Sequence, residues 1–106
     1  MPASQFDSPA TLEADGTVRV GGDVEASFAT LSDVEFRFLL VQGEVVVQGS
    51  GRGSNDRWAG TTDPGQAALQ AGSVLAIGLA VVARQTPQPG YQTFSWSEQI
   101  DLVAAS

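Results

Sequence analysis

The chain has 106 residues and a formal net charge of −7, because twelve acidic side chains outnumber five arginines. Histidine, cysteine and lysine are absent. Without them the chain has no Ser-His-Asp triad, cysteine nucleophile, Schiff-base lysine or His/Cys zinc site. The sequence therefore predicts no catalytic residue, no metal ligand and no cofactor, and it favours a protein that is not an enzyme.

Length and hydropathy predict a single domain over residues 1–106, with residues 1–9 as a loosely ordered N-terminal segment. A hydrophobic content of 42% with 16% charged residues argues against disorder. No apolar run approaches the roughly 20 residues that span a bilayer, so membrane insertion is not expected. The first four residues lack the basic and apolar regions of a signal peptide, which leaves the cellular location open.

The charge distribution disfavours nucleic acids and anionic membranes as partners. Both require clustered cations, whereas the arginines are scattered over positions 19, 37, 52, 57 and 84. The excess of acidic residues is typical of a soluble surface rather than of a specific site. The expected partner is a protein or a small apolar molecule.

Apolar and polar residues alternate with a period of two through most of the chain, which predicts β-strands with one buried face. In chain order, strands are expected at 11–14, 18–28, 34–41, 45–47, 57–61, 73–84 and 91–103. Turn residues separate them, and the segment Ser50–Asp56 is expected to be the longest flexible loop. Helical periodicity is nowhere sustained. The fold predicted is an immunoglobulin-like antiparallel β-sandwich of seven to eight strands.

The last two strands have a preferred register, in which the large aliphatic residues lie on the same side as the aromatic ones. The inner face would then hold Leu75, Ile77, Leu79, Val81, Phe94, Trp96, Ile100 and Leu102. The outer face would be flat, with Ala76, Gly78, Ala80, Thr93, Ser95, Ser97 and Gln99. Small side chains give little steric obstruction to another surface. We therefore predict that a partner that binds a sheet contacts this face, with Ser95, Ser97 and Gln99 among the binding residues. The alternative left open is that neighbouring side chains or a terminal segment cover the face.

Glu98 is the one charged residue in the inward column of the last strand. If it is buried it needs a polar partner, which makes it a candidate binding residue. The alternative, which we favour, is structural: a bulge or the open end of the sandwich turns the carboxylate to water, or an inward charge protects an edge strand from aggregation.

Three aromatic residues are candidates for stacking on a ligand. Trp96 is expected in the core, with Phe36, Phe38, Ile77 and Leu79 as its neighbours, because such sandwiches bury an aromatic residue between their sheets. Trp58 follows a glycine-rich loop, and its location is left open between core and ligand site. Tyr91, next to a proline-rich turn, is the aromatic residue most expected at the surface. The alternative left open is that its ring packs on those prolines.

Two further kinds of site have little support in the sequence. The segment Gly49–Gly53 lacks the strand and helix that frame a phosphate-binding loop. Acidic and amide residues that could bind calcium have no known ligand spacing; these are Asp15, Asp23, Asp33 and the segment 54–56. A hydrolase that uses two carboxylates would need a pair held about 5 to 9 Å apart, and no spacing in the chain singles out such a pair.

Several short segments carry a resemblance to a known family: Gly16–Gly22, Leu40–Gly43, Trp58, Pro64-Gly65, Gly72 and Ser97–Leu102. With these segments the chain resembles a family of small exported bacterial Ig-like β-sandwich proteins of unknown function. The resemblance implies an extracellular location and no catalytic residue. That family usually carries a cysteine pair, where this chain has Ala26 and the segment 53–55.

We interpret the sequence as a non-enzymatic binding or structural module with an unidentified partner. The first alternative is a small-molecule carrier with an apolar cleft, and the second is a hydrolase that uses only carboxylates. An apolar pocket with convergent polar groups would favour the carrier. Two acids facing each other across a cleft would favour the enzyme. A closed core with shallow surface grooves would favour the interaction module.

Overall fold

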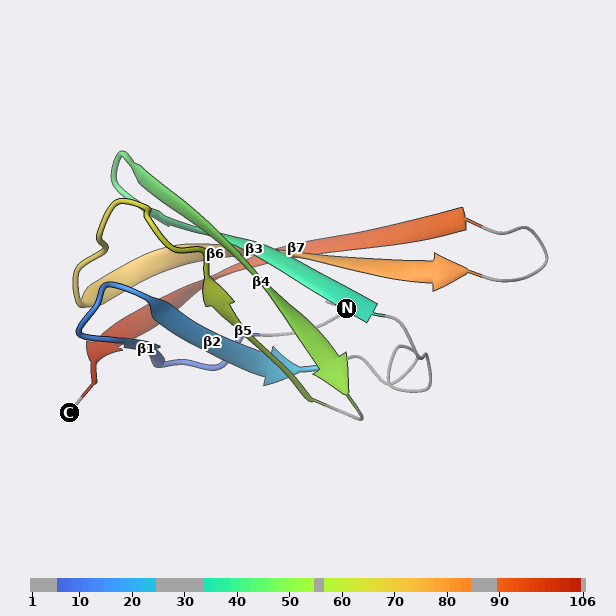
Figure 1. The fold of residues 1–106 in the computed structure, drawn as a ribbon, viewed down its shortest axis with the longest axis horizontal. Coiled ribbons are helices and arrows are strands. Elements are labelled where there is room, and N and C mark those ends of the chain that lie inside the picture. Colours follow the sequence, from blue (N-terminus) through green and yellow to red (C-terminus); the bar gives the residue numbers. More distant parts are fainter. Residues whose placement is uncertain (1–5, 25–33, 55–56, 85–89, 106) are drawn as a thin grey trace.

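The computed structural model describes residues 6–24, 34–54, 57–84 and 90–105, and the regular structure in these ranges is all β (Figure 1). The strands are β1 (Ala10–Leu12), β2 (Val18–Asp23), β3 (Val34–Gln42), β4 (Val45–Ser54), β5 (Arg57–Thr62), β6 (Gly72–Arg84) and β7 (Gly90–Ala104). The predicted all-β class is confirmed. No helix in the described ranges is long and apolar enough to cross a membrane.

The strands form one closed barrel, in the order β1-β2-β5-β4-β3-β6-β7. Neighbours are antiparallel except at the closure, where β1 and β7 run parallel through Ala10↔Leu102, Thr11↔Val103 and Leu12↔Ala104. This corrects the predicted immunoglobulin-like sandwich. A sandwich consists of two sheets that pack face to face, whereas here β1 joins β2 to β7 and makes a single sheet continuous.

Strand β4 occupies most of the segment that the sequence predicts as a flexible loop. Its Gly51 lies opposite Gly60 of β5. A Cβ atom at Gly51 would overlap the main chain of Ala59, and one at Gly60 would overlap the main chain of Ser50. Because neither residue has a side chain, the main chains of β4 and β5 can approach each other closely at this point. Glycine at such positions allows the strong bending that a closed barrel requires. The loop prediction is therefore wrong for residues 50–54, while 55 and 56 lie outside the described residues.

Five aromatic side chains fill the barrel interior: Phe6, Phe36, Phe38, Trp58 and Trp96. Phe36 and Trp58 stack with centroids 4.9 Å apart, and Phe6 meets Trp58 edge to face at 5.3 Å. Trp96 packs against Phe36 at 6.2 Å and is only 9% exposed, which confirms its prediction as a core residue. Rings of this size leave the interior filled by side chains, as in other small barrels.

The observed register of β6 against β7 is the opposite of the predicted one. Gly78 lies opposite Trp96, and Ala80 lies opposite Phe94. The large aliphatic residues of β6, including Ile77 and Leu79, therefore face outward and are not neighbours of Trp96. The physical reason is volume, because a Cβ atom at Gly78 would overlap the Trp96 ring. Only the smallest residues fit beneath an indole that already fills the interior.

Candidate binding surface

The predicted flat face is divided between the two sides of the barrel wall. Ser95, Ser97 and Gln99 of β7 lie on the exposed outer side, as predicted. Ala76, Gly78 and Ala80 of β6 are buried on the inner side, so their prediction as outer residues is wrong. The outer neighbours of the serines are instead large aliphatic residues of β6.

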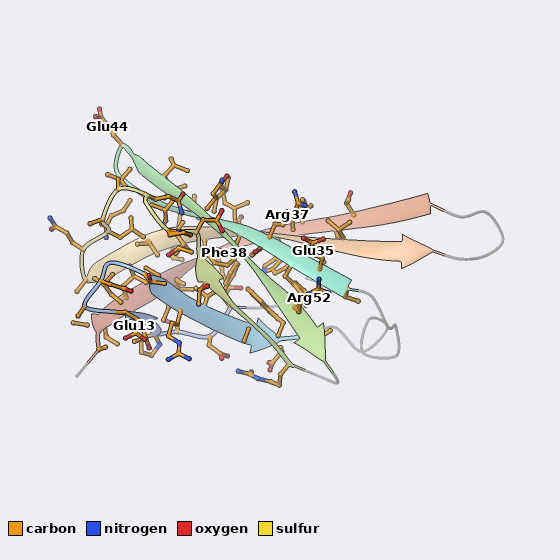
Figure 2. All side chains as sticks on the ribbon, in the orientation of Figure 1. Glu13, Glu35, Arg37, Phe38, Glu44 and Arg52 are labelled. Carbon is orange, nitrogen blue, oxygen red and sulfur yellow. The ribbon has the colours of Figure 1, made fainter. Side chains whose placement is uncertain are left out.

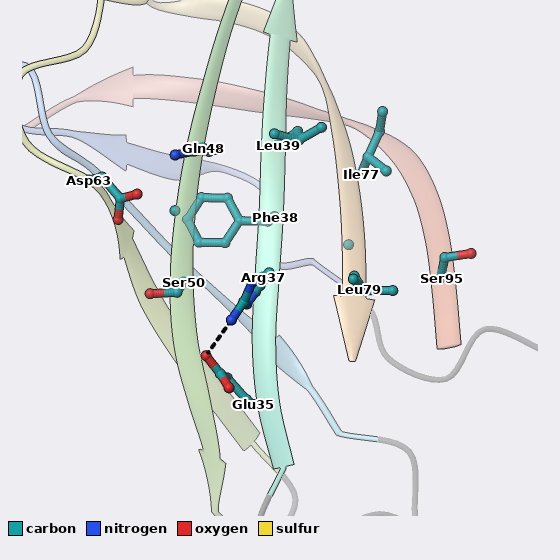
Figure 3. Close-up of a pocket in the computed structure, with 12 residues that line it drawn as sticks. Glu35, Arg37, Phe38, Leu39, Gln48, Ser50, Asp63, Ile77, Leu79 and Ser95 are labelled. Carbon is teal, nitrogen blue, oxygen red and sulfur yellow. Dashed lines mark ion pairs between the residues drawn. The ribbon is translucent and has the colours of Figure 1, made fainter. Parts of the chain in front are cut away.

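The outer surface of β3, β4 and β6, together with Ser95 of β7, carries an open groove of about 520 Å³, which we call the outer-face groove (Figure 3). Leu39 of β3 pairs with Ile77 of β6, and Leu79 of β6 pairs with Ser95 of β7. Further lining residues are Glu35, Arg37, Phe38, Gln48, Gly49, Ser50, Asp63 and Gly78. Leu39 is 37% exposed, and Ile77 and Leu79 are partly exposed. The groove therefore has an aliphatic floor in the middle of a strand surface.

Charged residues of both signs flank this aliphatic floor. The Arg37 Nη2 and Glu35 Oε1 atoms form an ion pair of 3.5 Å with both side chains well exposed, and Arg52 lies opposite Glu35 on β4 (Figure 2). Asp63 lines the groove beside β4. An exposed ion pair of this kind contributes at most about 1 kcal/mol to stability. These residues are therefore available to a partner without loss of the fold.

Glu98 anchors the N-terminal segment rather than a ligand. Its Oε2 atom accepts a hydrogen bond of 3.0 Å from the main-chain N–H of Phe6. Nearby, the main-chain N–H of Asp101 donates to Ser8 Oγ at 3.1 Å. The carboxylate thus accepts a main-chain hydrogen bond where this segment approaches β7, and the Phe6 side chain packs in the core beside it. This contact is structural, but it is not the predicted bulge, since the pairing of β6 with β7 continues without interruption past Glu98, and the carboxylate binds the Phe6 main chain. A binding role for Glu98 stays a prediction.

The other two aromatic candidates give no surface site in the described structure. Trp58 is 2% exposed and stacks on Phe36 inside the barrel, so it is a core residue. Tyr91 belongs to β7, but its side chain lies outside the described side chains.

The candidate calcium ligands are used in other ways. Asp23 binds Arg57 Nη1 at 2.7 Å, and Asp7 binds the same guanidinium. The hydrogen bonds that the Arg57 guanidinium donates to Asp7 and to Asp23 raise the pKa of Arg57 above its ordinary value. This arrangement, which the sequence does not signal, ties the N-terminal segment and β2 to β5. Among the described residues no group of three or more acidic side chains could hold a metal ion, and positions 33, 55 and 56 lie outside them.

A smaller cavity of about 180 Å³ lies between the turn at 15–17 and the segment 62–69. Asp15 accepts a hydrogen bond of 2.9 Å from the Thr17 main-chain N–H, which lowers the pKa of its carboxyl group. On the other side, the Gln66 side chain both accepts from and donates to the main chain of Gln48, at 2.7 Å each. These contacts stabilise the two turns, and the larger aliphatic residues that line the cavity, Val18, Val47 and Leu69, are buried in the core.

Comparisons of the chain with protein-family models, with curated proteins and with solved structures found no match.

The aliphatic floor of the groove is the part of the surface that sequence analysis missed. Strand β6 is apolar on both faces, so its alternation does not show which face is inside. A signal was nevertheless present in the side-chain volumes. Ala76, Gly78 and Ala80 leave room for large rings on the opposite strand, whereas the leucines and isoleucine of β6 do not.

Proposed function

We propose that this protein is a non-enzymatic binding module that docks a protein partner onto the outer-face groove. One observation carries the proposal: the barrel interior is filled by aromatic rings, while Leu39, Ile77 and Leu79 form an aliphatic floor on the outside. Large residues exposed together on one face are typical of an interaction site. A ligand site inside the barrel would need space that the rings occupy.

The partner that fits this surface is a basic protein with an aliphatic contact residue. The chain carries a net charge of −7, which attracts a basic partner at long range and raises its association rate. At short range the groove offers apolar contact. Glu35, Arg37 and Asp63 at its margin can form ion pairs with charged residues at the rim of the interface. An apolar centre with a charged rim is the usual organisation of a protein interface.

The two alternatives have less support. The groove volume of about 520 Å³ lies within the range of small-molecule sites, but the groove is an open strand surface rather than a cleft between loops. For a carboxylate-only hydrolase, two acids should face each other across a cleft. Asp7 and Asp23, which lie on either side of Arg57, are instead both bound by that one arginine.

The experiment is affinity capture from an extract of the source cells, with proteins and small molecules both identified by mass spectrometry. Three baits are compared: the wild type, the groove variant Leu39→Asp/Ile77→Asp, and the control Val46→Asp/Val103→Asp. The control makes the same chemical change at exposed apolar positions, 54% and 45% exposed, that do not line the groove. Circular dichroism checks that all three are folded.

We expect a basic protein that the wild type and the control capture and that the groove variant loses. Titration of that purified protein should then show binding at least about tenfold weaker for the groove variant, equivalent to about 1.4 kcal/mol. Equal capture by all three baits, or co-purification of a small molecule alone, would overturn the proposal. The second result would instead support the carrier.

A further inference from the structure

Strand β7 has a long edge that no described strand occupies. It spans Gly90–Ala104 and pairs with β6 from Gly90 to Leu102, but β1 covers its other side only at Leu102, Val103 and Ala104. The described strands β1 to β6 each have neighbours on both sides. Figure 1 shows the end of the β6–β7 hairpin projecting beyond the barrel, whereas Thr93, Ser95 and Ser97 lie opposite residues of β6 that also pair with β3.

The main-chain direction of each β7 residue follows from one hydrogen bond. The N–H of Asp101 donates to Ser8 Oγ on the side away from β6. The pairing with β6 continues without interruption from Gly72↔Leu102 to Arg84↔Gly90. Because main-chain groups alternate between the two edges of a strand, Thr93, Ser95 and Ser97 direct their N–H and C=O groups to the same side as Asp101. No described main-chain partner meets these groups.

The sequence of this edge lacks the usual protection. Exposed edges are normally blocked by charged residues, proline or bulges, but the segment 90–97 has neither a charge nor a proline and its pairing with β6 has no bulge. The nearest charge along the strand, Glu98, is bonded to Phe6. Phe94 and Trp96 direct their main chain toward β6, so the free edge is presented by Thr93, Ser95 and Ser97.

We propose that this edge is where a second copy of the chain binds, with the two β7 strands antiparallel about a two-fold axis at Ser95. In this register Ser95 lies opposite Ser95 of the second copy, and Thr93 lies opposite Ser97. Each of the three residues supplies one donor and one acceptor, which gives about six main-chain hydrogen bonds across the axis. Cross-strand pairs of serine and threonine are also favourable side-chain neighbours.

The edge is complementary to itself, which favours a second copy as its occupant, because about the two-fold axis each N–H of Thr93, Ser95 and Ser97 meets a C=O of the same three residues in the other copy. Each copy carries a net charge of −7, so two copies could approach only where their contact residues are uncharged. The segment 90–97 meets this condition. A two-fold axis also keeps the same face of each sheet outward, because antiparallel pairing about it preserves the alternation of sides. The two outer-face grooves would then lie on one continuous surface. This association does not depend on the partner proposed above.

Sedimentation equilibrium of the wild-type protein from about 10 μM to about 1 mM provides the first test. We expect the weight-average mass to rise from 11.0 kDa toward twice that value as concentration increases. Edge pairing over so few residues buries a small interface, so the association should be weak and concentration-dependent. A mass that stays at 11.0 kDa over the whole range would overturn the proposal.

Charge substitutions at the axis test the register. Ser95→Lys and Ser95→Asp should each weaken association by about tenfold or more, because like charges lie directly opposite each other across the axis. An equimolar mixture of the two variants should associate again. Ser50→Lys is the matched control, since Ser50 lines the same groove but belongs to β4, whose edges are both paired. It should associate as the wild type does.

Two further outcomes would overturn the edge interface. If Ser50→Lys weakens association as much as Ser95→Lys, the two copies meet through the groove instead. If the mixture of opposite charges stays monomeric while circular dichroism shows both variants folded, Ser95 does not lie at the axis. Loss of heterologous capture by the groove variant, with dimerisation intact, would show that the two proposals concern separate contacts.

Discussion

The two sides of strand β6 are composed in opposite ways. The column that faces the barrel interior holds the smallest residues, Ala76, Gly78 and Ala80, and the column that faces outward includes Ile77 and Leu79. In most proteins the larger apolar residues are inside. The difference shows that side-chain size on this strand follows the space left by the opposite strands. The small residues of β6 pack against the aromatic rings of the interior, and its large residues lie on the outer side of the barrel.

The two sides also differ in what their residues have to satisfy. The inner column is constrained by packing, where even one added methyl group is felt. The outer column is constrained less by packing, because Ile77 and Leu79 are only partly buried. Substitutions on the two sides should therefore have different effects on the free energy of unfolding.

The largest effect is expected inside the barrel, for Trp96→Ala. Trp96 contacts Phe6, Phe36 and Trp58 at centroid distances of 5.6, 6.2 and 6.4 Å. Removal of its ring should lower the free energy of unfolding by about 3–5 kcal/mol, from the roughly 5–15 kcal/mol typical of a domain. Urea denaturation measures this change. A variant as stable as the wild type would show that Trp96 is not part of the core.

Gly78→Ala should lower the free energy of unfolding by about 1–3 kcal/mol, because the new methyl group would overlap the Trp96 ring. The cost should largely disappear in a background where Trp96 is Leu, since the smaller side chain leaves room. A double-mutant cycle measured by thermal unfolding tests this coupling. Additive effects of the two substitutions would mean that residue 78 and the indole do not compete for the same space.

On the outer side, Leu79→Ala should change the free energy of unfolding by no more than about 1 kcal/mol, because a partly exposed side chain contributes little to packing. The neighbouring inner substitution Ala80→Leu is the comparison, and it should be clearly more destabilising because it overfills the interior. Chemical denaturation of both variants gives the result. If Leu79→Ala were the more costly of the two, the assignment of the two columns would be reversed.

The smallest effect is expected at Asp15, far from both columns. Its carboxylate accepts a hydrogen bond from the Thr17 main-chain N–H, which lowers its pKa below 3.8. A lowered pKa in the folded state stabilises the protein above the unfolded-state pKa, and this stabilisation is lost as pH falls through the folded-state value. The wild type should thus be slightly more stable than Asp15→Asn at neutral pH, and the difference should vanish in acid. An NMR titration that places this carboxyl pKa above 3.8 would contradict the prediction.

The strands were largely predictable from local pattern, whereas the barrel was not. Alternation identified β2, β3 and β7 because each has one apolar face, and the burial of Trp96 followed from its column. Closure depends on β1, a strand of three residues that joins β2 to β7. Such a short strand has little periodicity of its own. The glycines of β4 suggested a loop because their role, close approach to β5, is a non-local property.

The candidate surface was predictable in part. Ser95, Ser97 and Gln99 were predicted to face outward, and they do; their role in binding stays a prediction. The aliphatic residues beside them were placed inside because hydrophobicity alone assigned them to the core. Their true position follows from the volumes of side chains on other strands, which pattern within one strand does not contain.

The parallel pairing of β1 with β7 has a mechanical consequence. These are the first and last strands of the barrel, so tension between the two chain ends would pull them in opposite directions along their length. The hydrogen bonds of Ala10↔Leu102, Thr11↔Val103 and Leu12↔Ala104 lie across that direction. They would be loaded together in shear, rather than opened one after another as in an unzipped hairpin. The barrel should accordingly resist stretching from its ends better than stretching across the β6–β7 hairpin.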